Sequence, residues 1–204
     1  MNNDPEQNST VFIVDDDQAI RHAMELLMRS VGLDYEIYHS ADDFLDSFSH
    51  EKAGCLVLDI RMPGLGGLEL QDKLIEMRSS LPIIFITGHG DVPMAVEAMQ
   101  KGAVDFIQKP FRDQELLDRI GEALKTDQER RTEREEHAEV QSRINKLTKR
   151  ENEVFDLVVT GKPNKVIAYE LGVSQRTVEI HRARVMEKMQ ARSLADLVRM
   201  HLAT

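Results

Sequence analysis

The feature that most constrains the fold is an alternation, within residues 1–124, of short apolar runs and segments with helical periodicity. The runs are VFIV (11–14), CLVLD (55–59), PIIFIT (82–87) and VDFIQ (104–108), with a weaker run at YEIY. Strands that alternate with helices predict βαβ units, hence a parallel sheet with helices on both faces. Five strands favour the flavodoxin-like (βα)5 order, in which the functional site lies beyond the carboxyl ends of the strands.

Acidic side chains stand where two of these strands end. Asp15, Asp16 and Asp17 follow the first run, and Asp59 ends the second clear run. Adjacent like charges repel each other, and a bound cation is the usual compensation. Carboxylate oxygens suit a hard cation such as Mg²⁺. Asp17 by itself is better explained as the cap of the following helix.

Two further polar residues are predicted at the same edge of the sheet. Thr87 ends a third strand, and Lys109 follows the last one. Since the carboxyl ends of parallel strands share one edge, we expect this hydroxyl and this ammonium group near the carboxylates. Together they suit the oxygens of a phosphoryl group. Phe106, three residues before Lys109, is either a core residue or a side chain that switches conformation with the state of the site.

The charge is distributed unevenly along the chain. Residues 1–124 hold 10 basic and 23 acidic side chains, a net charge of −13. Residues 125–146 hold 6 of each, and residues 147–204 hold 10 and 7, a net charge of +3. An acidic first part and a mildly basic last part indicate two domains with different partners. We therefore expect domains over 1–124 and 147–204, joined by a linker over 125–146.

The segment 125–146 is predicted to be a long linker helix. It is rich in charged residues, and opposite charges stand four residues apart at Asp127–Arg131 and Glu139–Arg143. Such pairs favour a solvated helix. A sustained coiled coil is disfavoured because no apolar heptad runs through the segment.

Cysteine usage and hydropathy indicate the compartment. Cys55 is the single cysteine, which excludes an intrachain disulfide, and we expect it to be a small buried residue in a protein of the reducing cytosol. No apolar run approaches the roughly 18 residues of a membrane span. The polar start MNNDPEQNST lacks the build of a signal peptide. The expected localisation is cytoplasmic, with no membrane partner.

Residues 147–204 predict an all-α domain of four helices. Thr148 and Glu151 form a capping box before the first helix, and Ser174 and Ser193 are placed to cap the third and the fourth. Gly172 ends the second helix, and the turn LGVS leads into the third. Two helices joined by so short a turn are typical of a helix-turn-helix that binds DNA.

The third helix, from Ser174 to about Met189, would read the DNA. Val178, Val185 and Met189 recur on one face, which is predicted to be buried. A modest charge of +3 leaves open a merely solvated basic face. The candidate DNA contacts, which share an outward position or a basic side chain, are Lys165, Arg176, Thr177, Glu179, Ile180, Arg182, Ala183, Arg184 and Lys188, with Lys162 as a further basic residue.

Four motifs in the first part resemble the receiver domain of bacterial two-component response regulators. They are VDDD (14–17), LDIRMPG (58–64), ITGHGD (86–91) and DFIQKPF (105–111), in order at predicted strand ends. The resemblance covers about residues 10–124. It implies a domain that binds Mg²⁺ (or Mn²⁺) and is controlled by phosphorylation.

The resemblance also implies the roles of the acidic residues. Asp59 is expected to be the phospho-acceptor. Asp16 and Asp59 would hold the metal ion directly, Asp15 mainly through water, and the backbone carbonyl of Arg61 would be a further ligand. Apart from the resemblance, the position of Arg61 two residues beyond Asp59 predicts that its side chain helps to screen the phosphorylated Asp59 from water.

The same resemblance assigns roles around the phosphoryl group. Thr87 and Lys109 would contact its oxygens, and Phe106 would change rotamer on activation. The Lys109–Pro110 bond is expected to be cis. His89 lies two residues beyond Thr87, and this position predicts that it also helps to screen the phosphorylated Asp59 from water.

The pattern LTKRENEV…LADLVRM over 147–202 resembles the LuxR-type helix-turn-helix. With the receiver, it resembles regulators of the FixJ/NarL group. This resemblance implies a transcriptional regulator that phosphorylation activates. It would activate promoters and would not be an enzyme. Its expected partners are a sensor histidine kinase, double-stranded promoter DNA, RNA polymerase and, on phosphorylation, a second copy of the chain.

Two other function classes remain as alternatives. A phosphatase with an aspartyl nucleophile usually carries a DxDxT-type sequence after its first strand, whereas this chain has VDDDQAI. A quorum regulator that senses a ligand shares the C-terminal domain, but the N-terminal part here has strand-end carboxylates and no tryptophan. Labelling with acetyl phosphate and Mg²⁺ would separate the three classes.

Overall fold

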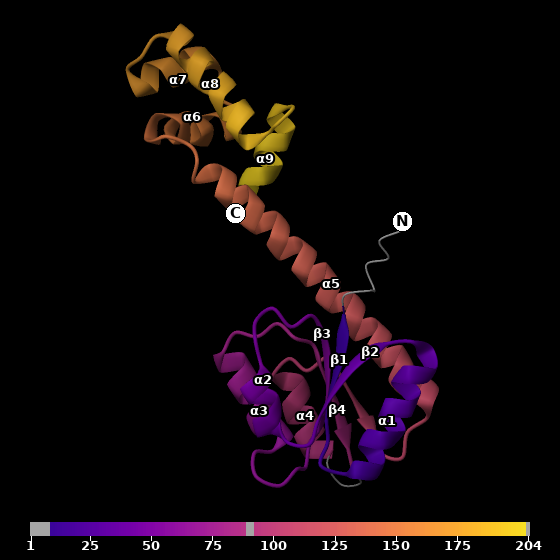
Figure 1. The fold of residues 1–204 in the computed structure, drawn as a ribbon. Helices are drawn as coiled ribbons and strands as arrows, with labels where there is room; N and C mark the ends of the chain where they lie inside the picture. Colours follow the sequence, from indigo (N-terminus) through magenta and orange to yellow (C-terminus); the bar gives the residue numbers. More distant parts are fainter. Residues whose placement is uncertain (1–8, 89–91, 203–204) are drawn as a thin grey trace. The chain divides into compact units, whose positions relative to one another are not determined.

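The predicted alternation of strands and helices folds as a parallel α/β domain followed by helices. The structure is a computed structural model that describes residues 9–88 and 92–202 (Figure 1). The chain divides into two compact units, Met1–Arg131 and Thr132–Thr204, and each is described by itself. The predicted linker boundaries at 124 and 146 lie on either side of this division and stay predictions.

Within the described part of the first unit, five parallel strands form one sheet with the order β2-β1-β3-β4-β5. The strand order confirms the predicted flavodoxin-like fold. It places β1, β3 and β4 in the interior of the sheet, where their apolar runs are covered on both faces. The strands are β1 (Thr10–Val14), β2 (Asp34–Tyr38), β3 (Gly54–Asp59), β4 (Ile83–Thr87) and β5 (Asp105–Gln108).

Helices cover both faces of the sheet, as Figure 1 shows. Alternate residues of each strand point to opposite faces, so the apolar runs supply two cores. Phe12 and Leu56 belong to the core under α2, α3 and α4, whereas Val11 and Cys55 belong to the core under α1 and α5. The helices are α1 (Gln18–Val31), α2 (Ala41–Ser47), α3 (Gly67–Glu76), α4 (Val92–Gln100) and α5 (Asp113–Ile144).

The helix α5 is continuous across the predicted linker. The predicted ion pair between Arg143 and Glu139 is present, with an N–O distance of 2.6 Å. At Asp127 the expectation of a solvated helix is wrong. Its side chain is only 2% exposed, and the carboxylate accepts a hydrogen bond from the backbone N–H of Gly54. The helix therefore still packs on the sheet at this turn.

The second unit contains, besides the end of α5, the helices α6 (Lys149–Val159), α7 (Asn164–Leu171), α8 (Gln175–Met189) and α9 (Leu194–Leu202) among its described residues. The predicted caps are confirmed at Thr148, Ser174 and Ser193. Gly172 ends α7 with φ of +65°, a conformation that glycine adopts without steric cost. The core combines apolar residues of α6 to α9, including Phe155 and Val178.

Across residues 9–88 and 92–202, we find no helix with the length and the hydropathy that crossing a membrane requires.

Candidate functional site

Three strand ends converge on one ammonium group at the carboxyl edge of the sheet. Asp15 directly follows β1, Asp59 ends β3, and Lys109 directly follows β5. The Nζ of Lys109 lies 2.8 Å from Oδ2 of Asp15 and 2.7 Å from Oδ1 of Asp59. The backbone N–H of Lys109 donates to the carbonyl of Thr87 at 2.7 Å, which fixes the loop after β5 against β4. The structure thus brings Asp15, Asp59 and Lys109 into contact and places Thr87 beside Lys109.

The electrostatics of this cluster are those of a desolvated acid beside a cation. Asp15 and Asp59 are both buried. Burial raises the pKa of the Asp59 carboxyl, and the hydrogen bond from Lys109 only partly offsets this. Burial by itself would lower the pKa of Lys109, but its hydrogen bonds to Asp15 and Asp59 raise it. Lys109 therefore carries the positive charge that compensates the two acids.

The metal-ligand set predicted from the sequence is only partly gathered. Asp59 accepts the backbone N–H of Arg61 at 3.1 Å, so the carbonyl of Arg61 belongs to the same turn. Asp16 lies beside Asp15, but its side chain is exposed. Across 9–88 and 92–202, no three His, Cys, Asp or Glu side chains already surround one point as metal ligands. The donor set is nevertheless all oxygen, which fits Mg²⁺ and not a soft metal.

The remaining receiver residues occupy β4 and β5. Thr87 is buried at the end of β4. Phe106 is 40% exposed, so it is not part of the core, and its register partner on β4 is Phe85. The Lys109–Pro110 bond is cis, as expected. His89 lies outside the described residues.

Two contacts that support the site were not predicted from the sequence. The Nη1 of Arg21 donates to the carbonyl of Asp15 at 2.7 Å, and no local pattern marks this residue. Gly67 packs so closely behind Asp59 that a Cβ there would lie 2.3 Å from the Asp59 carbonyl oxygen. The repeated glycines of GLGG were the available signal for such a close approach.

The α8 helix divides into a buried and an outward face as predicted. Val178, Val185 and Met189 are buried in the core of the second unit. On the other side, Ile180 is 47% exposed. Four further predicted DNA contacts on α8, namely Arg176, Glu179, Ala183 and Arg184, are exposed, as is Lys165 on α7.

Several of the other predicted DNA contacts are already engaged within the protein. Lys188 lies 2.6 Å from the buried carboxylate of Glu151 and also donates to the carbonyl of Lys146. Arg182 donates to Asn164 on α7 at 3.0 Å. Thr177 donates its backbone N–H to the capping hydroxyl of Ser174. These residues support the helix-turn-helix itself, whatever they contact on DNA.

One further basic residue is paired as well. Lys162, which precedes α7, lies 2.7 Å from the carboxylate of Glu170. Both side chains are partly exposed, so water screens the pair and its net contribution is small.

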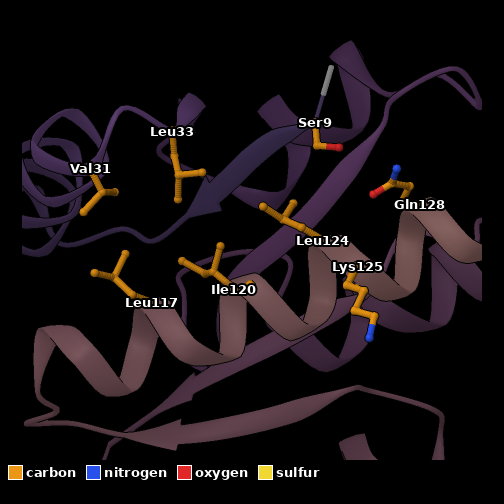
Figure 2. A pocket seen from close by; sticks show the side chains of 9 residues that line it. Ser9, Val31, Leu33, Leu117, Ile120, Leu124, Lys125 and Gln128 are labelled. Atoms are coloured by element: carbon orange, nitrogen blue, oxygen red, sulfur yellow. The ribbon is translucent and has the colours of Figure 1, made fainter. Parts of the chain in front are cut away.

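A hollow of about 420 Å³ lies at the other edge of the sheet from Asp59 (Figure 2). It opens between α5 and the segment where α1 ends and β2 begins. Its apolar walls lie toward Val31, and its polar rim lies toward Ser9, which precedes β1. The hollow is therefore separate from the carboxylate cluster. Its lining residues are Ser9, Val31, Leu33, Leu117, Ile120, Gly121, Leu124, Lys125 and Gln128.

Comparison with known families gives two matches along the chain. Residues 11–121 match the family described as the response regulator receiver domain. Residues 145–201 match the bacterial regulatory proteins of the luxR family. The two matches together span most of the chain.

Individual relatives are similar over nearly their full length. Nodulation protein W of Bradyrhizobium diazoefficiens is 50% identical over 190 residues, which are 93% of this chain and 84% of that protein. The transcriptional regulatory protein FixJ of Rhizobium meliloti is 45% identical over 194 residues, 95% of each chain. The solved structure of the response regulator StyR is 45% identical, with a TM-score of 0.89 over 97% of this chain and 100% of that one.

Proposed function

Since this chain belongs to the two-component response regulators of the FixJ/NarL type, which are DNA-binding transcriptional regulators and not enzymes, we propose that Asp59 is its phospho-acceptor. The observation that carries the proposal is the cluster of Asp15, Asp59 and Lys109 at one edge of the sheet. An oxygen of the Asp59 carboxylate forms a bond to phosphorus, and the bond from phosphorus to the histidine nitrogen of the kinase breaks. The freed electron pair stays on that histidine.

Receiver domains of this kind use Mg²⁺ for phosphorylation. Here the ion would be held by Asp15, Asp16, Asp59 and the backbone carbonyl of Arg61, and Mn²⁺ has the same preference for oxygen. It would supply positive charge beside the transferred group. Thr87 and Lys109 would donate hydrogen bonds to the phosphoryl oxygens, and Phe106 would change rotamer as they do so.

The phosphorylated protein is proposed to regulate transcription. A response regulator has a histidine kinase as its partner and binds DNA. The finer proposal is that a sensor histidine kinase phosphorylates the receiver (1–124), that two receivers pair, and that the domains over 147–204 occupy two half-sites of promoter DNA. The linker (125–146) joins them, and the bound dimer activates RNA polymerase. The exposed outward residues of α8 support this reading of the DNA contacts.

Acetyl phosphate with Mg²⁺ tests the assignment of Asp59. The wild type should gain one phosphoryl group, seen by intact-protein mass spectrometry, and Asp59→Asn should gain none because the amide is not a nucleophile. Asp16→Ala should also label poorly, but higher Mg²⁺ should partly restore it. Asp17→Asn, a change in the neighbouring helix cap, is the matched control and should label normally. Equal labelling of Asp59→Asn would refute the proposal.

A further inference from the structure

Asp127 is a buried carboxylate that the proposed phosphorylation chemistry does not use. Its side chain is 2% exposed, and its Oδ2 accepts a hydrogen bond from the backbone N–H of Gly54 at 2.8 Å. Gly54 begins β3, and Asp59 ends the same strand. The strand that carries the phospho-acceptor is therefore held, at its first residue, by a residue of α5 that lies 73 positions later in the sequence.

The backbone at Gly54 explains why an acceptor is needed there. Gly54 has φ of +136°, and a Cβ would lie 1.8 Å from the carbonyl oxygen of Thr10, so a larger residue would not fit. The backbone thus passes close to β1 and turns its N–H toward α5. A buried N–H without an acceptor is strongly destabilising. The carboxylate of Asp127 supplies that acceptor.

Apolar packing becomes sparse at the turn of α5 that holds Asp127. Ala123 is buried in the core, whereas the hollow of Figure 2 adjoins Leu124, Lys125 and Gln128. One turn later, Nη1 of Arg130 donates to the carbonyl of Ser80 at 3.4 Å, in the loop before β4. Polar contacts to β3 and to this loop therefore replace the apolar core, and the first compact unit extends as far as Arg131.

We infer that Asp127 is a positioning residue that fixes the direction in which α5 leaves the receiver. The inference rests on the proposed function, in which paired receivers present two DNA-binding domains. With Asp127 in place, α5 belongs to the body of the receiver up to about Arg131. Without it, the helix is free to bend near Leu124, where the apolar core ends. The paired DNA-binding domains would then accept a wider range of half-site spacings.

Hydrogen exchange of the full-length protein tests the anchor directly. Asp127→Ala should lower the protection of the Gly54 amide and of amides 126–131 by about 10- to 100-fold, as expected for the loss of a buried bond to a charged acceptor. Asp127→Asn retains an acceptor oxygen and should keep most of the protection. Glu129→Ala, which removes an exposed carboxylate from the same turn, is the control and should change nothing. Unchanged protection in Asp127→Ala would overturn the inference.

The spacing of DNA half-sites tests the positioning role. A promoter duplex selected by the phosphorylated wild type is lengthened by 5 or by 10 base pairs between its half-sites, which is about half a turn or one turn of DNA. The wild type should bind the 5-base-pair insertion at least about tenfold more weakly than the 10-base-pair insertion. Asp127→Ala should bring the ratio of the two affinities toward one, and Asp127→Asn should keep this ratio near the wild-type value.

Separate controls distinguish this inference from the proposed function. Phosphorylation of Asp59 by acetyl phosphate should be unchanged in Asp127→Ala. If that variant misfolds, Arg130→Ala, which removes the hydrogen bond to the carbonyl of Ser80, should give a partial loss of the ratio. Equal ratios in wild type and variants, or a wild type that ignores the spacing, would overturn the inference. Absence of phosphorylation or of operator selection in the wild type would instead refute the proposed function.

Discussion

At the scale of single residues, the buried acid Glu151 of the C-terminal unit both caps α6 and binds the basic side chain of Lys188. Glu151 is 2% exposed and completes the capping box by accepting the backbone N–H of Thr148 at 2.8 Å. It also accepts from Lys188 on α8 at 2.6 Å. These hydrogen bonds from Lys188 and Thr148 lower the pKa of Glu151 to about 2.

The stability of α6 should therefore depend on pH. Because the pKa of Glu151 in the folded state lies below the value of about 4.3 in an unfolded chain, its contribution is present above that value. It should be lost as the pH falls from about 4.3 toward 2. Hydrogen-exchange protection of α6 amides should show this fall in the wild type. Glu151→Gln should be less protected at pH 6 and should lack this part of the fall, whereas Glu153→Gln should behave as the wild type.

The ion pair with Glu151 distinguishes Lys188 from Arg184, although both basic residues were predicted from the sequence to contact DNA. Lys188→Ala should leave the buried carboxylate of Glu151 without its charged partner and lower the free energy of unfolding by about 2–3 kcal/mol. Arg184→Ala changes an exposed residue and should leave the unfolding free energy unchanged. It should weaken operator binding and reduce the salt dependence by about one unit of slope. Urea unfolding and binding at several salt concentrations check both, and a destabilised Arg184→Ala would contradict the assignment.

At the scale of elements, the start of α3 controls the position of Asp59. Gly67→Ala would place a Cβ 2.3 Å from the Asp59 carbonyl oxygen, so the end of β3 or the start of α3 must move. We expect phosphorylation by acetyl phosphate to slow about tenfold or more, because a small displacement of the attacking carboxylate lowers the rate strongly. Gly66→Ala is the matched control, since its Cβ would lie at an ordinary distance of 3.6 Å from the Ile60 carbonyl oxygen. Equal rates in the two variants would show that the strand end tolerates the shift.

The elements themselves were predictable because their signals are local. Four apolar runs, helix caps such as Ser174, and the ending glycine Gly172 each mark a boundary in the sequence. The meeting of Asp15, Asp59 and Lys109 was predictable as well, because parallel strands end at one edge. The exposure of Asp16 was not, since it depends on how one side chain turns.

Other features of the structure leave little trace in the sequence. Helical periodicity treats a charged residue as exposed, so Asp127 was expected in solvent. Its partner is a backbone N–H 73 residues away, which no local pattern records. Lys188 was likewise predicted to contact a DNA phosphate because it is basic. Its pairing with Glu151 could not be predicted, since it depends on how α8 packs against α6.

At the scale of the whole molecule, pairing of receivers is expected to be the switch. The phosphorylated protein should sediment as a dimer, and the dimer should bind the operator more tightly because the second domain binds at a high effective concentration. The isolated fragment 142–204 should bind the same DNA weakly and without regard to phosphorylation. Sedimentation and gel-shift measurements check both. A phosphorylated protein that stays monomeric yet binds tightly would favour release of a clamped DNA-binding domain.

The division inside α5 also bears on how modules of such regulators can be exchanged. The first compact unit ends at Arg131, in the middle of a continuous helix. A chimera that joins this receiver to a foreign output domain should therefore retain residues through Arg131 and splice helix to helix, keeping the period of 3.6 residues per turn. A graft made at Leu124 would discard Asp127 and leave the N–H of Gly54 without its acceptor. Such a hybrid would lose a contact inside its receiver, although the sequence around Leu124 reads as the start of a linker.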